Sequence, residues 1–186
     1  MKKHLTITLA LAAGLTFASM PGASAEEFTC RRSVGSTTVD NLRVPDGATC
    51  TLNGTTVKGT IKVESQAALR AEGVRVIGNV QAEDASRVVI VASSRVGGSV
   101  QVVQGGAAKV ANSRVNGDIL YDDNDRALRV LRSTVGGSVQ VFHNTGGVEI
   151  RANHIDGNLQ CKENSPRPTG GGNVVGGNKE DQCARL

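Results

Sequence analysis

Hydrophobic and polar residues alternate along short segments of this chain, and the alternation returns at a nearly constant interval. The clearest unit, Val96-Gly97-Gly98-Ser99-Val100-Gln101-Val102, recurs as Val135-Gly136-Gly137-Ser138-Val139-Gln140-Val141. Weaker copies share its central glycine, and the glycines are Gly59, Gly78, Gly98, Gly117, Gly137, Gly157 and Gly177, 19 or 20 residues apart. Alternation with a period of two predicts half-buried strands, and a repeat near twenty residues predicts a solenoid of stacked coils.

In each coil the strand that follows the central glycine, here called the glycine strand, carries one pair of nonpolar positions. A second pair lies between the glycine strand and the next repeat. Counted backwards from that repeat, they are Cys50, Leu69, Val89, Ala108, Leu128 and Val148, followed two residues later by Leu52, Ala71, Val91, Val110, Val130 and Ile150. One coil cannot cover its own nonpolar side, so we expect stacking to bury these residues. The one-residue difference between coils is then expected in the loop between the two strands. Just before each repeat, Ser94, Ser113, Ser133, Asn153 and Asn173 predict an internal hydrogen-bonded ladder.

The predicted fold is all-β, a single-stranded parallel β-helix of about seven to eight coils with a period of 19–20 residues. Residues 57–174 form the regular coils, residues 26–56 an N-terminal capping segment and first coil, and residues 175–186 a C-terminal capping coil. The Val-x-Gly-x-Val-x-Val units over residues 40–180 resemble the right-handed parallel β-helix of the pectin-lyase-like superfamily, as found in small secreted bacterial proteins. The pattern is more weakly similar to that of bactofilins, which polymerise through similar coils. The resemblance implies a right-handed solenoid.

The first 25 residues have a different pattern. Met1-Lys2-Lys3, a nonpolar run from Leu5 to Phe17 and the small residues Ala23-Ser24-Ala25 predict a secretory signal peptide cleaved after Ala25. The mature chain is therefore expected to be secreted, periplasmic or extracellular, with no transmembrane segment. Cleavage removes two lysines and no acid, and the formal net charge falls from +4 to +2. With this small charge and few aromatic residues for stacking, we expect no nucleic-acid partner.

All four cysteines follow residue 25, and in an exported protein they predict disulfides. Cys30 and Cys50 are one period apart, and Cys161 and Cys183 are 22 residues apart. Stacked coils are separated by roughly 4.8 Å, a distance that a disulfide can bridge. The alternative pairings would cross several coils, so the repeat predicts Cys30–Cys50 and Cys161–Cys183.

Short polar side chains occupy the outward positions of the glycine strands. Of these we take as candidate ligand-binding residues, together called the polar lane, Ser99, Gln101, Asp118, Ser138, Gln140, Asn158 and Gln160. Such a face can hydrogen-bond the hydroxyl groups of an extended polysaccharide. It is also typical of a polar ladder that joins stacked strands without any ligand.

A row of arginines precedes three successive repeats. The expected separation of roughly one coil spacing applies to Arg75, Arg95 and Arg114. At this distance the three positive charges repel one another unless anions or acidic side chains neutralise them. Arg70, Lys109 and Arg129 form a second basic row nearby. The rows are interpreted either as an edge that binds an anionic polymer or as a solvated flank paired with acids such as Glu72.

Three nonpolar residues stand where other coils carry polar ones: Val103, Leu120 and Phe142. They form either an exposed partner-binding patch or a surface covered by a loop.

The sequence gives little support for catalysis. Asp118 is the one internal carboxylate of the polar lane, whereas a glycosidase needs two. No catalytic-triad or metal-ligand spacing is visible, and the acidic loop at 122–125 lacks the pattern of an EF-hand. We therefore expect no enzyme, no cofactor and no metal.

The function predicted is that of an exported, non-enzymatic, monomeric surface or envelope-associated protein. Its expected partner is an extended glycan or another anionic envelope polymer. The alternatives are a structural, self-associating or adhesive module and, ranked third, a polysaccharide lyase or hydrolase.

Overall fold

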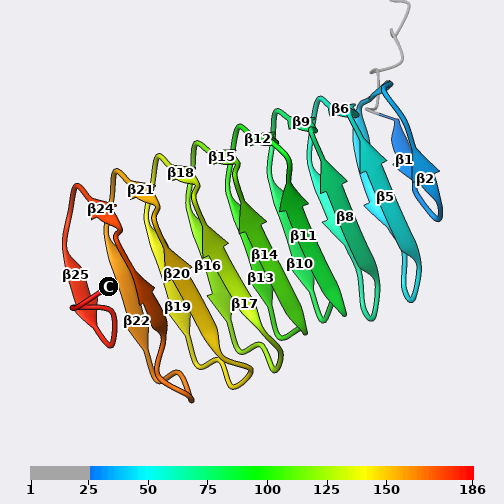
Figure 1. Ribbon diagram of the computed structural model, residues 1–186. Coiled ribbons are helices and arrows are strands. Elements are labelled where there is room, and N and C mark those ends of the chain that lie inside the picture. The colour runs from blue at the N-terminus through cyan, green and yellow to red at the C-terminus, as the bar shows by residue number, and fades with distance from the viewer. Residues whose placement is uncertain (1–25) are drawn as a thin grey trace, which may run out of the picture.

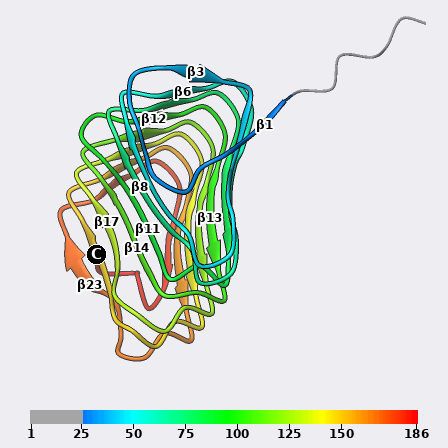
Figure 2. The ribbon, with the colours of Figure 1, turned by 90° about the vertical axis from the view of Figure 1, so that its right-hand side faces the viewer.

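The computed structural model describes residues 26–186, and within them every regular element is a β-strand. The predicted signal peptide, residues 1–25, lies outside the described residues. The strands follow one another as coils stacked along a single axis (Figure 1), and a view turned by 90° shows successive coils overlying each other (Figure 2). The predicted parallel β-solenoid with a period near twenty residues is thus confirmed.

Each coil contributes one strand to each of three parallel sheets. Sheet A contains β1 (Glu27–Thr29), β4 (Asn41–Val44), β7 (Ile61–Val63), β10 (Val80–Glu83), β13 (Val100–Val103), β16 (Ile119–Asp122), β19 (Val139–Phe142), β22 (Leu159–Lys162) and β25 (Lys179–Asp181). Sheet B contains β2 (Ser33–Val34), β5 (Thr49–Asn53), β8 (Ala68–Glu72), β11 (Arg87–Val91), β14 (Ala107–Ala111), β17 (Leu128–Leu131), β20 (Val148–Arg151) and β23 (Thr169–Gly171). Sheet C contains β3 (Thr38–Val39), β6 (Thr56–Val57), β9 (Arg75–Val76), β12 (Arg95–Val96), β15 (Arg114–Val115), β18 (Thr134–Val135), β21 (His154–Ile155) and β24 (Val174–Val175).

The core is a set of nonpolar columns that run through the coils. In sheet A the first inward column is at most 1% exposed and consists of Ile61, Val80, Val100, Ile119, Val139 and Leu159. Branched and nonpolar side chains suit these positions because they pack well on a pleated surface. Every interior coil therefore depends on its two neighbours for burial.

The prediction for one strand of sheet B is wrong. Val89 and Val91 were expected inside, but Val88 and Ile90 take the inward positions, at 1% and 0% exposure. The coil that contains β11 has one residue more than the coil before it. This extra residue lies after β11, where Ala92 and Ser93 both have positive φ, and not in the loop between the strands of sheets A and B. Counting backwards from the next repeat therefore assigned the inward positions of β11 one residue too late. A shift of one residue exchanges the two faces of a strand.

The predicted polar ladder before the repeats is confirmed, and a second ladder was missed. In the first, the Asn153 side-chain amide donates to Asn173 Oδ1 at 2.9 Å, and both residues are buried. In the second, the Asn124 side-chain amide donates to Asn144 Oδ1 and that of Asn144 donates to Asn164 Oδ1, both at 2.9 Å. The ladder ends where the Asn164 amide donates to Gln182 Oε1. Asparagines recurring at intervals of 20 residues were the signal in the sequence.

The two predicted disulfides are confirmed. Cys30–Cys50 and Cys161–Cys183 join neighbouring coils near the two ends of the solenoid, with Cα separations of 5.5 and 5.2 Å. Both are compatible with an oxidising, extracellular environment.

Candidate anion-binding face

The arginine row lies on sheet C, in register. Arg95 pairs with Arg75 on one side and with Arg114 on the other, so the three residues occupy equivalent places in β9, β12 and β15. Each is followed by a buried valine, and because side chains alternate along a strand, each arginine points outward. All three arginines are exposed. The local sequence Arg-Val, repeated once per coil, therefore builds the row.

No carboxylate group forms an ion pair with this row within residues 26–186. None of the three arginines lies within salt-bridge distance of an acid, and Arg114 instead donates from Nε to Asn116 Oδ1 at 2.9 Å. Glu72, the acid suggested as a partner, forms its ion pair with Arg70 on sheet B. The row thus presents three positive charges to solvent.

A hollow of about 310 Å³ lies beside the row and is lined by all three arginines together with Ile77, Gly97 and Asn116. The backbone is close-packed at its floor, where a Cβ atom on Gly97 would stand 2.3 Å from the carbonyl oxygen of Ile77. Any side chain at this glycine would require the coils to move apart. Gly97 therefore lets the backbone approach the Ile77 carbonyl oxygen closely at the floor of the hollow.

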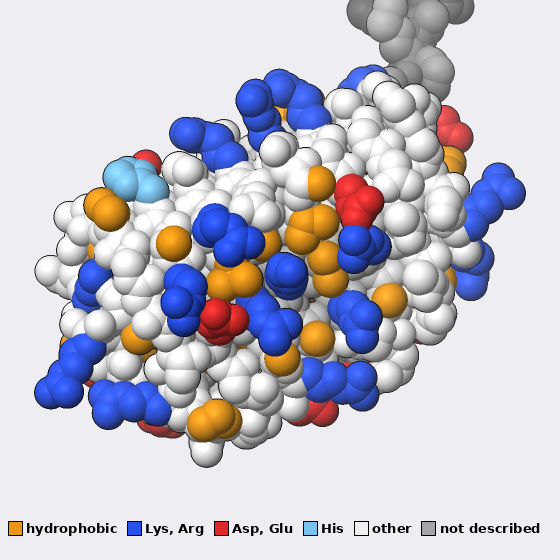
Figure 3. Space-filling model, in the orientation of Figure 1, with side chains coloured by type: hydrophobic (Ala, Val, Ile, Leu, Met, Phe, Trp, Pro, Cys, Tyr) orange, Lys and Arg blue, Asp and Glu red, His pale blue; other side chains and the backbone are white. Residues whose placement is uncertain are grey.

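Sheet B extends the basic surface. Its outward positions and its edge carry six cationic side chains against two acids, Glu72 and Glu149; the cations are Arg70, Arg87, Lys109, Arg129, Arg132 and Arg151. Glu149 pairs with Arg129 and Arg151 at 3.5 and 3.3 Å. The space-filling view shows Lys and Arg spread over this face, with nonpolar side chains among them (Figure 3).

The predicted polar lane on sheet A is tied into the fold. Asp118 N donates to Ser99 Oγ at 3.0 Å, Ser138 N to Asp118 Oδ1 at 2.7 Å and Asn158 N to Ser138 Oγ at 3.0 Å. Asn158 Oδ1 accepts from Asn178 N at 2.9 Å. Each of these side chains thus bonds the backbone of the next coil. Binding of a glycan by this column stays a prediction.

The neighbouring glutamine column is only partly joined in this way. Gln140 donates to Gln160 at 3.0 Å, and Gln160 donates to Glu180 at 2.7 Å. Gln101 is separated from them by Leu120, its partner in β16. Gln101 instead lines a hollow towards the N-terminal end, and its role as a ligand-binding residue stays a prediction.

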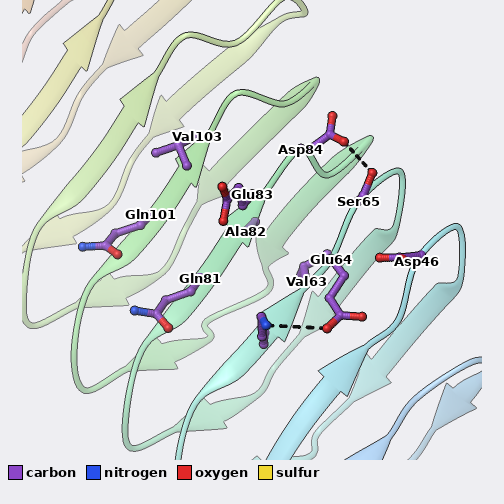
Figure 4. Close-up of a pocket in the computed structure, with 11 residues that line it drawn as sticks. Asp46, Val63, Glu64, Ser65, Gln81, Ala82, Glu83, Asp84, Gln101 and Val103 are labelled. Atoms are coloured by element: carbon purple, nitrogen blue, oxygen red, sulfur yellow. Dashed lines mark hydrogen bonds and ion pairs between the residues drawn. The ribbon is translucent and has the colours of Figure 1, made fainter.

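A second hollow lies over sheet A and is acidic. It measures about 590 Å³, and its carboxylates come from Asp46, Glu64, Glu83 and Asp84, with Lys62 as the one cation in its lining (Figure 4). Lys62 lies 3.6 Å from Glu64. Sequence reasoning missed this hollow, although Glu64 and Glu83 follow the same strand in adjacent coils. Its negative charge disfavours anions, so the two faces of the solenoid differ in sign.

The three nonpolar residues predicted as a partner patch are half-buried and interrupted. Val103 and Phe142 each pair in register with Asp122, whose carboxylate therefore stands between them, and Leu120 lies in the next outward column. A role for this patch in binding a partner stays a prediction.

His143 joins three coils beside this patch. Its Nδ1 lies 2.9 Å from Asp122 Oδ1 and its Nε2 lies 3.3 Å from Glu163 Oε2. The hydrogen bond with Asp122, assisted by the charges of Glu163 and Asp123, raises the pKa of His143 above 6.5.

A pH-dependent contribution to stability follows from the raised pKa of His143. The protonated ring stabilises the folded state fully below the unfolded pKa of about 6.5, and this contribution is lost as pH rises through the folded pKa. Denaturation of the parent and of His143→Gln at pH 5.5 and pH 8.5 is expected to show the larger difference in stability at pH 5.5. A difference that grows towards pH 8.5 would contradict this sign.

Repulsion among the three arginines, which lack carboxylate partners, is expected to destabilise the ligand-free protein at low salt. At one coil spacing, two unit charges repel by about 0.9 kcal/mol in bulk water. Arg95→Gln, which removes the middle charge, should raise the free energy of unfolding by about 0.5–1 kcal/mol at 10 mM salt, and the gain should vanish near 1 M salt. Urea denaturation measures it, with Arg185→Gln as the matched control. A loss of stability in Arg95→Gln at low salt would show that acids answer the row after all.

Within residues 26–186, no group of histidine, cysteine and acidic side chains is arranged to hold a metal ion. No helix in this described part has the length and hydrophobicity needed to cross a membrane. Comparisons with protein-family models, with curated proteins and with solved structures found no match to this chain. The fold is a parallel β-solenoid, and no match supports the finer resemblance to pectin-lyase-like proteins or to bactofilins.

Proposed function

We propose that this protein is an exported, non-enzymatic binding protein whose basic face, formed by sheets B and C, holds an extended anionic polymer. The observation that carries the proposal is the row Arg75, Arg95 and Arg114, in register and without a carboxylate partner in the described chain. Exposed like charges kept in a regular row cost free energy, and a polymer with repeated negative charges would offset that cost.

The chemistry of arginine supports binding over catalysis. A guanidinium group presents a planar fork of donors that matches carboxylate, sulfate or phosphate groups, and it is weakly hydrated compared with an ammonium group. It stays protonated across the physiological range, so it does not exchange protons as a general acid or base. Eight of the nine cations on this face are arginines, and Lys109 is the exception.

The two charge signs also favour a defined orientation. A polyanion is attracted to sheets B and C and repelled by the acidic hollow over sheet A. Export rests on the predicted signal peptide together with the two disulfides. An acidic polysaccharide of a cell envelope or of the extracellular medium is the class of partner that fits this location.

Binding of polygalacturonic acid tests the proposal, with its fully methyl-esterified form as the matched neutral polymer. Calorimetry of the oxidised chain, residues 26–186, is expected to show binding of the acid at 50 mM salt. The affinity should fall about 20-fold by 200 mM salt, as for release of counterions from about three ion pairs. Absence of binding at 50 mM salt, or equal binding of the esterified polymer, would overturn the proposal.

A further inference from the structure

Ile77 is an exception among the exposed nonpolar residues. Three large nonpolar side chains are exposed within residues 26–186: Phe28 at 36%, Ile77 at 52% and Val174 at 61%. Phe28 lies in β1, the terminal strand of sheet A, where no further coil covers it, and Val174 lies in β24, the terminal strand of sheet C, in the outward column of His154. Ile77 follows β9 in the middle of the solenoid, with coils on both sides. An open end of the solenoid therefore does not account for its exposure.

The repeat gives no structural reason for an isoleucine at this position. In the other coils the equivalent residues are polar or glycine: Lys58, Gly97, Asn116, Gly136, Asp156 and Gly176. Ile77 does not belong to the hydrophobic core cluster. A large nonpolar side chain facing solvent gains free energy when a ligand covers it.

Ile77 and the arginine row line the same hollow. The hollow of about 310 Å³ places this nonpolar side chain among Arg75, Arg95 and Arg114, above the side-chain-free backbone of Gly97. Its lining therefore combines three guanidinium groups without a carboxylate partner, one exposed nonpolar side chain and the Asn116 amide. A ligand that satisfies it needs both repeated anionic groups and a nonpolar face.

The direction of the row sets the direction of the ligand. Along the solenoid axis a chain meets three successive arginines on sheet C, whereas across a single coil it meets only two cations, such as Lys109 and Arg114. A linear polymer aligned with the axis therefore makes more charge-assisted hydrogen bonds than one lying across it.

We infer that this hollow is a binding site for a chain of acidic sugars. The carboxylate groups of successive sugars engage Arg75, Arg95 and Arg114, and the nonpolar C–H face of one ring packs on Ile77. This inference rests on the proposed function and assigns the contact for one sugar ring of the acidic polysaccharide to Ile77. A polyphosphate carries the charge but has no nonpolar face, so it gains nothing from Ile77.

The test compares two linear anions, a galacturonic acid trimer and tripolyphosphate, at 50 mM salt. Ile77→Asn is expected to weaken binding of the trimer about tenfold and binding of tripolyphosphate less than about twofold, since only the sugar ring loses a nonpolar contact. Val174→Asn, which alters an exposed nonpolar residue of a terminal strand, is the matched control and should leave both affinities unchanged. Monomeric galacturonic acid is expected to bind about 100-fold more weakly than the trimer, because it cannot use the row as a unit.

The possible failures are distinct. If Ile77→Asn weakens both ligands equally or neither of them, or if the monomer binds as well as the trimer, the inference is overturned while anion binding by the basic face stands. If the parent protein binds polygalacturonic acid but neither short anion at 50 mM salt, the inference is overturned and the proposed function stands. If it binds none of the three, the proposed function fails, and the inference fails with it. Urea denaturation of each variant shows whether it remains folded.

Discussion

Replacing Arg75, Arg95 and Arg114 together by glutamine is expected to lower the affinity for polygalacturonic acid by about 100-fold at 50 mM salt. Each arginine removed should eliminate one released counterion, so the loss follows from about three ion pairs at this salt concentration. The slope of log affinity against log salt should become shallower by about 2. Calorimetric titration of the parent and the triple variant over a range of salt concentrations measures both quantities.

The control for this experiment removes the same charge from elsewhere. Lys62, Lys162 and Lys179 lie in sheet A and are exposed, and their replacement by glutamine changes the net charge equally. This variant should bind polygalacturonic acid within about threefold of the parent, because distant charges are screened over about 10 Å at 0.1 M salt. Equal losses in the two triple variants would mean that net charge, not the arginine row, governs binding.

The second large effect concerns the core. Ile90→Ala should lower the free energy of unfolding by about 4 kcal/mol, because it leaves a cavity between coils that cannot collapse without disturbing their pairing. Ile90 is fully buried and pairs with Ala71 and Val110 in the adjacent strands. Val91→Ala, one residue further along, should cost less than about 1 kcal/mol because Val91 faces outward and is only half-buried.

Urea denaturation of these two variants tests the register of β11 directly. The predicted order of stability is parent, then Val91→Ala, then Ile90→Ala. The reverse order for the two variants would restore the register obtained by counting backwards from the next repeat.

Most of the fold could be predicted from the repeat period. Alternation and a spacing near twenty residues predicted parallel coils, the inward columns of sheet A and both disulfides, because stacked coils bring equivalent positions together. The period could not say where within a coil an extra residue is inserted. Ala92 and Ser93 take positive φ without being glycine or asparagine, so nothing in their side chains marked the wider corner.

The candidate site was predictable only in part. The arginine row follows from the repeat alone, since Arg75, Arg95 and Arg114 each stand one residue before a coil start. The acidic hollow needed the path of the loops, because Asp46 and Asp84 reach it from outside the strands of sheet A. The role of the polar lane depended on the distance between a side-chain oxygen and the next backbone N–H, such as 3.0 Å between Ser99 and Asp118, which the sequence does not contain.

The exposure of Ile77 was equally hidden in the sequence. Its place directly after the inward Val76 marks it as outward-facing, but only the neighbouring Gly97 and the arginines around it make a hollow with mixed chemistry. The hollow is therefore formed by residues of three successive coils that are neighbours in space but not in sequence.

Protection of arginines from chemical modification tests the central claim most directly. The oxidised chain, residues 26–186, would be treated with an arginine-specific reagent with and without polygalacturonic acid, and the modified peptides would be quantified by mass spectrometry. We expect the polymer to protect Arg75, Arg95 and Arg114, whereas the exposed Arg167 and Arg185, in the last two coils, react as before. Binding without protection of the row, or protection spread equally over all exposed arginines, would contradict the assignment of the basic face as the site.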